Sequence, residues 1–353
     1  MYHQFFGLSK DPFSMTPDPA FLFLTAPHRE ALAGLTYSIL NRKGFVVLTG
    51  DAGTGKTTLL GRIFLSIPST RVRFSVILNP TLTPAEFLEL TLLDFGITDI
   101  PASKAQRLTL LQHFLIDAYN KHQVAALVVD EAHKLPPDVL EEIRLLSNFE
   151  LADAKLLQIV LAGQTELGDI LNRQDLRQLK QRIAVRLAIH PLSASGVEHY
   201  IQYRWQKAGA TLPHPFHPDA VTRIAHCSRG IPRLVNALCD NALMLAYAEG
   251  KTTIGTAELI EVAQDLDLEA PGRLIRPALA PPNAQRPRME RKAETPVAVN
   301  GHGNRVANPA APAPVLVPTL QSYARSADKP SRLMRLANKL GIAAKPAEAA
   351  KKD

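Results

Sequence analysis

The chain has 353 residues, of which 46% are hydrophobic, enough for one large or two compact domains with buried cores. Its two cysteines, Cys227 and Cys239, lack the spacing of metal ligands, which argues against a disulfide framework or a cysteine metal centre and favours buried thiols. The amino terminus has no apolar run behind a basic start, and no stretch approaches the roughly 20 apolar residues that cross a bilayer. We therefore expect a cytoplasmic protein with no signal peptide and no transmembrane segment.

The net charge of +7 is unevenly distributed along the chain. Residues 270–353 contain 15 Lys and Arg against 5 Asp and Glu, whereas residues 1–269 contain 25 against 28. A basic tail is attracted to anionic partners such as nucleic acid or a membrane surface, which leaves DNA open as a partner and a position peripheral to the inner membrane open as a location. The alternative is a solvated extension without a partner.

The first half of the chain alternates between short apolar runs and helical patterns. Five runs predict strands, the last of them weakly: 45–49, 72–78, 124–129, 156–162 and 185–189. The helical patterns between them cover residues 58–66, 85–94, 103–122 and 137–149. Continuous apolar strands that alternate with helices indicate a parallel sheet covered by helices on both faces.

The pattern changes after Pro191, where only helices are predicted, over residues 194–208, 218–226, 231–249 and 256–265. The stretch from residue 270 onward holds 12 of the 27 prolines. We therefore predict four parts: an α/β domain over 1–191, a small all-helical lid domain over 192–269, a disordered Pro/Ala-rich linker over 270–330, and a basic tail over 331–353. In the tail, Leu333, Leu336 and Leu340 share one face of a short amphipathic helix.

A glycine-rich motif follows the first predicted strand and opens the next helix. It matches the P-loop pattern GxxxxGK[ST] in full and consists of Gly50, Asp51, Ala52, Gly53, Thr54, Gly55, Lys56 and Thr57, with Thr58 next in the chain. The glycines let successive backbone N–H groups point into one concavity, and the helix start also favours phosphate. Lys56 is expected against the β- and γ-phosphates of ATP, and the Thr57 hydroxyl on Mg²⁺.

Two acids, Asp130 and Glu131, end the third predicted strand. Because ligands sit beyond the carboxyl ends of parallel strands, Asp130 should help to hold the magnesium and Glu131 should polarise the attacking water. His133 completes the string DEAH, which is also the label of one helicase group, but the second RecA-like domain of that group and its late arginine-rich motif are not found. His133 is therefore expected at the surface or behind the reacting groups.

Polar residues at the ends of other strands complete the predicted site. If the fourth strand lies between the first and the third, Gln164 can reach the γ-phosphate or the water. Asn79, after the second strand, could hydrogen-bond Glu131 and hold it inactive; the alternative is a simple turn residue before Pro80.

Two groups of arginines are candidates for contact with nucleotide. Arg177, Arg182 and Arg186 lie before and within the fifth predicted strand, and the alternative for each is a solvated charge. Arg233 follows Pro232 at the start of a lid helix and should approach the γ-phosphate.

Five segments together are specific enough to suggest a family. GFVVLTGDAGTGKTTLL, ALVVDEAHKL, LQIVLAGQTEL, LRQLKQRIAVR and SRGIPRLVNALCDNAL resemble the ExeA/GspA-like AAA+ ATPases over roughly residues 1–268. The resemblance implies an α/β P-loop fold of the AAA+ kind with a helical lid, ATP hydrolysis and homo-oligomers such as rings. It also implies that Phe13 and His28 lie in the segment near the adenine. For the arginines at the fifth strand, it implies that one of them, Arg182 first and Arg177 second, reaches the ATP of a neighbouring subunit. Secretion members of this group continue into a transmembrane helix and a peptidoglycan-binding domain, neither of which is found here.

Three functions follow from these features. The first is an oligomeric ATPase that couples Mg-ATP hydrolysis to the remodelling or switching of a protein assembly, with an unknown partner at the cell envelope in secretion or exopolysaccharide production. The second is an ATP-dependent DNA-binding regulator, of the kind that the related TniB/TnsC ATPases represent in transposition. The third, a nucleotide-binding scaffold, is disfavoured by Glu131, which binding alone would not require.

Overall fold

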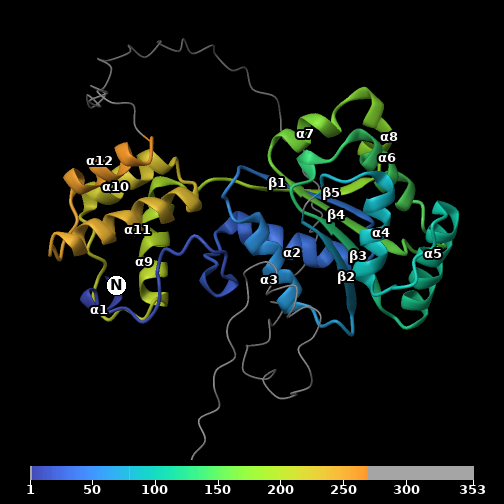
Figure 1. Cartoon of the computed structure of the whole chain (residues 1–353), viewed down its shortest axis with the longest axis horizontal. Helices are drawn as coiled ribbons and strands as arrows, with labels where there is room; N and C mark the ends of the chain where they lie inside the picture. The colour runs from blue at the N-terminus through green and yellow to red at the C-terminus, as the bar shows by residue number, and fades with distance from the viewer. Residues whose placement is uncertain (1, 79, 269–353) are drawn as a thin grey trace, which may run out of the picture. The chain divides into compact units, whose positions relative to one another are not determined.

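A computed structural model describes residues 2–78 and 80–268 of the chain (Figure 1). Its sheet has five parallel strands: β1 (Phe45–Gly50), β2 (Val72–Ile77), β3 (Val124–Val129), β4 (Leu157–Gly163) and β5 (Ile183–Ile189). The strand order is β2-β3-β4-β1-β5. All five strands lie where the sequence predicts them, within two residues at each end. The order also confirms the expectation that β4 lies between β3 and the P-loop strand.

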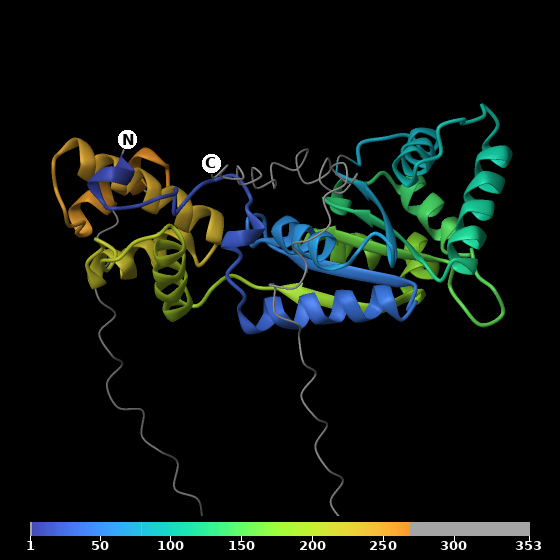
Figure 2. The ribbon, with the colours of Figure 1, turned by 90° about the horizontal axis from the view of Figure 1, so that it is seen from below.

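Helices cover both faces of the sheet, as Figure 2 shows from below. One core contains side chains of α4 (Pro84–Phe95), α5 (Lys104–Asn120), α6 (Pro137–Leu146), α7 (Glu166–Leu171) and α8 (Arg177–Gln181). The other contains side chains of α2 (Ala26–Leu40) and α3 (Lys56–Ser66). Because side chains alternate along a strand, Leu127 and Val129 enter the first core and Ala126 and Val128 the second. The sheet is thus the middle layer of three.

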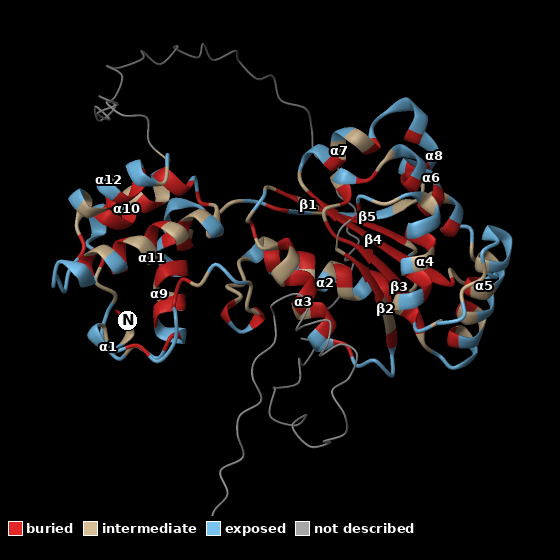
Figure 3. Cartoon of the chain, viewed as in Figure 1, coloured by how far each residue is buried: buried red, intermediate tan, exposed pale blue. Residues whose placement is uncertain are grey.

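Burial explains which strands the sequence predicts well. Every residue of β3 and β4 is buried, so β3 reads as an unbroken apolar run and β4 as an apolar run with one polar residue, Gln158 (Figure 3). Only Ile189 of the edge strand β5 is fully buried, and exposed residues alternate with half-buried ones before it. This alternation is why β5 gives the weakest signal.

The helices after the sheet form a separate core. They are α9 (Ala194–Lys207), α10 (Pro218–Ser228), α11 (Pro232–Ala248) and α12 (Thr256–Asp265). Trp205 is almost fully buried among them. Cys227 and Cys239 are also buried there, as the sequence predicts.

The first residues of the chain pack with this helical core. The helix α1 (Tyr2–Phe5) and a short 3-10 helix, Pro19–Phe21, contribute buried aromatic rings. Tyr2 donates a hydrogen bond to Asp240 at 2.5 Å, and the Arg204 guanidinium donates to the carbonyl of Pro12. These residues fall within the α/β domain predicted from the sequence, because they precede it directly in the chain. In the structure their aromatic rings are instead buried against α9 and α11.

The predicted linker over 270–330, the tail helix within 331–353 and Asn79 lie outside the described residues. Among the described helices, none combines the length and apolar character that crossing a membrane requires.

Candidate nucleotide-binding site

The P-loop connects the carboxyl end of β1 to the start of α3. Gly53 and Gly55 have φ angles of 80° and 100°, a left-handed conformation that glycine adopts without a Cβ clash. Space imposes a second constraint, since a Cβ on Gly53 would lie 2.7 Å from the Cβ of Arg233, and one on Gly50 would lie 2.5 Å from the carbonyl oxygen of Ile189. The loop therefore requires glycine both for its curvature and for its close approach to neighbouring segments.

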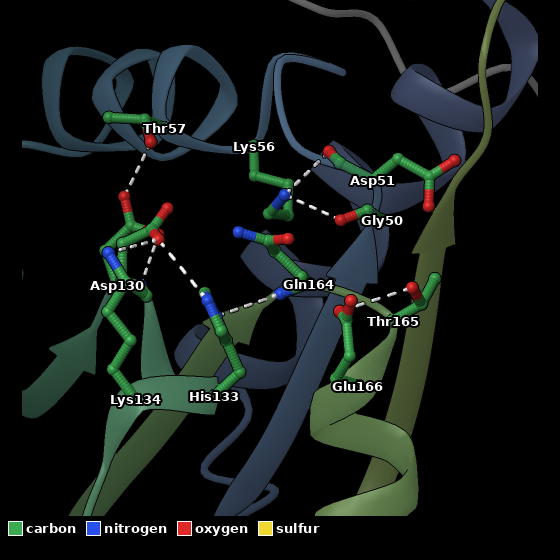
Figure 4. A network of polar contacts seen from close by, with 11 residues as sticks. Gly50, Asp51, Lys56, Thr57, Asp130, His133, Lys134, Gln164, Thr165 and Glu166 are labelled. Atoms are coloured by element: carbon green, nitrogen blue, oxygen red, sulfur yellow. Dashed lines mark hydrogen bonds and ion pairs between the residues drawn. The ribbon is translucent and has the colours of Figure 1, made fainter.

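The Lys56 side chain is buried beneath this loop. Its ammonium donates hydrogen bonds to the carbonyl oxygens of Gly50, at 2.7 Å, and Asp51, at 2.9 Å (Figure 4). Burial lowers the pKa of Lys56, and the nearby carboxylate of Asp130 opposes that shift. The two carbonyl oxygens thus hold the Lys56 ammonium at the loop. A bound phosphate would offer this ammonium a full negative charge, which the carbonyls do not carry.

Thr57 and Asp130 meet across the gap between α3 and β3. The Thr57 hydroxyl donates to a carboxylate oxygen of Asp130 at 2.6 Å, and the other oxygen accepts the backbone N–H of Glu131 at 2.9 Å. Burial raises the pKa of Asp130, while these two hydrogen bonds act to lower it. A buried carboxylate beside a hydroxyl provides two hard oxygen ligands.

These oxygens fit magnesium. Within residues 2–78 and 80–268, no group of three or more His, Cys, Asp or Glu side chains forms a metal cage. Mg²⁺ in phosphate-binding sites commonly takes one or two protein oxygens and completes its shell with water and phosphate oxygens. Thr57 and Asp130 can supply the two protein oxygens, and the adjacent P-loop can hold the phosphates whose oxygens would complete the shell.

Glu131 lies in a strained turn directly after β3. Its φ of 53° and ψ of 32° are left-handed, which is uncommon for a residue other than glycine. One oxygen of its carboxylate lies 3.2 Å from the Lys134 ammonium and 3.6 Å from Nε2 of His133. The sequence does not anticipate either contact, because both depend on the tight turn of the short 3-10 helix Ala132–Lys134.

Gln164 follows the carboxyl end of β4. Its side chain lines the same cavity as Lys56 and Glu131, and Figure 4 shows it extending toward Lys56. Its backbone N–H donates to Nδ1 of His133 at 3.3 Å. The strand order therefore brings Lys56, Asp130, Glu131 and Gln164 to one edge of the sheet.

A cavity of about 520 Å³ adjoins these residues, a size typical of small-ligand sites. Besides the P-loop, it is lined by residues 14–18 near the start of the chain and by Tyr200 and Asn236 of the helical part. The Tyr200 hydroxyl donates to the Asn236 side chain at 2.8 Å. This wall cannot be predicted from the sequence, because its parts are far apart in the chain and carry no local motif.

The two residues that the resemblance places near the adenine occupy different positions. His28 is buried beside the cavity, with Nε2 at 3.1 Å from the carbonyl oxygen of Thr54 and Nδ1 at 2.6 Å from the Thr25 hydroxyl. Burial lowers its pKa, and the hydrogen bond to Thr54 acts in the other direction. Phe13 is fully buried, packs edge-on against Phe216 in the helical core, and is not among the residues that line the cavity. His28 therefore supports the P-loop from behind.

The candidate arginines divide between two locations. Arg233, exposed at the start of α11, lines the cavity, and its backbone N–H donates to the carbonyl of Gly53 at 3.3 Å. Arg182 lies before the first residue of β5, at the opposite end of the sheet, where it donates to the Ser147 hydroxyl at 2.9 Å. Arg177 and Arg186 are exposed on α8 and β5. Arg182 is therefore separated from the cavity of its own chain by the length of β5.

A P-loop strand that pairs with β4, the strand just before Gln164, and a helical part that follows the sheet define the AAA+ class of P-loop NTPase fold. Solved structures share this architecture. Cdc6p from Pyrobaculum aerophilum matches with a TM-score of 0.57 and 20% identity over 73% of this chain and 71% of that chain. The ORC2 protein of Aeropyrum pernix, in ADPNP-ADP complexes, matches with a TM-score of 0.55 and 16% identity over 73% and 72%. These likenesses show the fold alone.

Sequence comparisons give a closer relationship. Residues 39–171 match the family described as AAA domain. General secretion pathway protein A from Aeromonas hydrophila is 44% identical over 260 residues, which are 72% of this chain and 46% of that protein. The chain belongs to the ExeA/GspA-like AAA+ ATPase family and spans about half the length of this curated relative.

Proposed function

We propose that this protein binds ATP with magnesium in the cavity beside the P-loop and hydrolyses it. The observation that carries the proposal is that Lys56, Thr57, Glu131 and Gln164 line one cavity, with Asp130 hydrogen-bonded to Thr57. Phosphoryl transfer needs positioning and charge neutralisation more than covalent chemistry, and this set of side chains supplies both.

Each side chain has a part in the proposed reaction. The Lys56 ammonium exchanges a loop carbonyl for phosphate oxygens, and the P-loop N–H groups hold the same phosphates. Thr57 and Asp130 hold the magnesium, which when bound neutralises charge on the β- and γ-phosphate oxygens. The Glu131 carboxylate orients a water and accepts its proton as it attacks, while the Gln164 amide holds the water or the γ-phosphate.

The test is phosphate release by the purified full-length chain with ATP. We expect turnover that depends on magnesium, because Thr57 and Asp130 can hold the ion but cannot themselves neutralise the charge of the phosphate oxygens. Excess EDTA should therefore abolish turnover. If calorimetry with the folded protein detected no uptake of magnesium and nucleotide, the proposal would fail.

We further propose that hydrolysis switches or remodels a protein assembly at the cell envelope, in secretion or in exopolysaccharide production. The 44% identity to general secretion pathway protein A supports this role. The partner can be captured with a Glu131→Gln variant that holds ATP without turning it over, using a Lys56→Ala variant as the control that cannot hold it. Recovery of the same proteins with both variants would argue against an ATP-dependent partner.

A second candidate function rests on the charge of residues 270–353, with 15 basic against 5 acidic residues. A DNA-binding regulator would bind duplex DNA with an affinity that depends on ATP and falls steeply with salt, because phosphate contacts release counterions. Absence of binding at low salt with an ATP analogue would exclude it.

A further inference from the structure

We propose that His133 is a positioning residue that couples Gln164, at the end of β4, to the Glu131 carboxylate, at the end of β3. The inference rests on the proposed ATP hydrolysis and assigns His133 a role in the chemical step. His133 is only partly exposed, at 13% of its side chain, and both ring nitrogens face polar groups of the site (Figure 4).

The hydrogen bonds fix how the imidazole is protonated. Nδ1 lies 3.3 Å from the backbone nitrogen of Gln164, which can only donate, so Nδ1 must accept. In the neutral ring the proton therefore sits on Nε2, which lies 3.6 Å from the Glu131 carboxylate. His133 thus accepts a hydrogen bond from the backbone N–H of Gln164, and its own Nε2–H faces the carboxylate that would activate the water, at a separation slightly longer than a hydrogen bond.

The backbone is built for this contact. The left-handed turn at Glu131 directs the chain back across the end of β4, and a Cβ on Gly163 would lie 3.2 Å from the backbone nitrogen of His133. A side chain at residue 163 would require Leu167 or the His133 backbone to shift by a few tenths of an ångström. Lys134 approaches the same carboxylate oxygen, at 3.2 Å, but it is solvent-exposed.

This arrangement makes the position of Glu131 depend on Gln164. When the Gln164 amide engages a γ-phosphate, any displacement of its backbone shifts the imidazole and, through Nε2, the carboxylate of Glu131. The water-activating carboxylate is thereby aligned when triphosphate is present, so His133 should affect turnover and leave nucleotide affinity unchanged.

The test compares His133→Ala with the wild type in the full-length chain, measuring turnover, the affinity for a non-hydrolysable ATP analogue, and thermal unfolding. Losing the hydrogen bond that the Gln164 backbone donates to His133 predicts a loss of about two- to thirteenfold in kcat. We expect the affinity to change less than about twofold. The matched control is His199→Ala, which removes an exposed histidine on α9 and should leave both quantities unchanged.

Two further variants separate coupling from simple packing. His133→Gln can place an amide N–H near the Nε2 position and should restore part of the lost turnover, even if His133→Ala folds poorly. In the Glu131→Gln background, single-turnover measurements should show no additional loss from His133→Ala, because both substitutions break the same link.

The outcomes are distinct. Wild-type protein without turnover would refute the proposed hydrolysis itself. Active wild-type protein whose turnover is unchanged or raised by His133→Ala would overturn the coupling, as would an equal loss in the Glu131→Gln background or a parallel loss of analogue affinity.

Discussion

The two ends of the central sheet carry different parts of the proposed catalytic machinery. At the carboxyl ends of β1, β3 and β4, one chain brings together Lys56, Asp130, Glu131 and Gln164. At the amino end of β5, Arg182 faces Ser147. The seven residues of β5 span roughly 20 Å, which is beyond the reach of a side chain. We therefore expect the first set to act on the chain's own nucleotide and Arg182 to act on the nucleotide of another copy.

The largest effect is expected from Lys56→Ala at the first end. The substitution leaves the carbonyls of Gly50 and Asp51 without the ammonium and removes a charge-assisted contact to phosphate. We expect at least about a 100-fold loss of nucleotide affinity, since hydrogen bonds to charged groups contribute about 1.5–3 kcal/mol and one ammonium makes more than one. Calorimetric titration with Mg-ATP measures this, and near wild-type affinity would remove Lys56 from the site.

Glu131→Gln should separate binding from chemistry at the same end. The amide is nearly isosteric with the carboxylate but cannot accept the proton of water, so turnover should fall about 100-fold or more while ATP remains bound. Phosphate release and analogue binding measured on the same preparation check this. Turnover within about twofold of the wild type would show that another group activates the water.

Arg182→Ala tests the opposite end. We expect unchanged nucleotide affinity and, at protein concentrations that allow assembly, a loss of turnover of about tenfold or more, because an arginine acting on a neighbour's phosphates stabilises transition-state charge. The exposed Lys180 of α8 provides a matched control as Lys180→Ala. If Arg182→Ala matched the wild type at high concentration, the assignment in trans would be wrong and Arg177 would be the next candidate.

The smallest effect is expected from deleting residues 270–353, which lie beyond the described cores of both the sheet and the helical part. Basal ATP turnover should stay within about twofold of the full-length chain. Phosphate release and thermal unfolding of the truncated protein check this, and failure to fold would contradict the assignment of residues 270–330 as a linker.

Local sequence features predict most of the fold. Buried strands such as β3 are unbroken apolar runs, and the start of α4 is marked by Thr83, which forms a reciprocal capping box with Glu86. The helix α2 was not predicted: its buried stripe of Ala31, Leu35 and Ile39 is narrow, so the periodic signal is weak.

The motif residues of the candidate site were also found from the sequence, because the P-loop and the paired acids have fixed spacing. The contacts of His133 and Lys134 with Glu131 could not be predicted, since they arise from a left-handed turn. The wall formed by Tyr200 and Asn236 depends on long-range packing, which leaves no mark in a local pattern.

The packing of the first residues against α9 and α11 has a consequence for how the lid can move. The chain passes between the helical core and the sheet twice, once near residues 22–25 and again near residues 190–193. A lid joined to the sheet by one connecting segment could rotate in any direction. A lid joined by two segments can rotate mainly about the axis that runs through both connections. The lid would then open and close about a single axis when nucleotide enters. Cross-linking the two connections should preserve this rotation and prevent rotation in other directions.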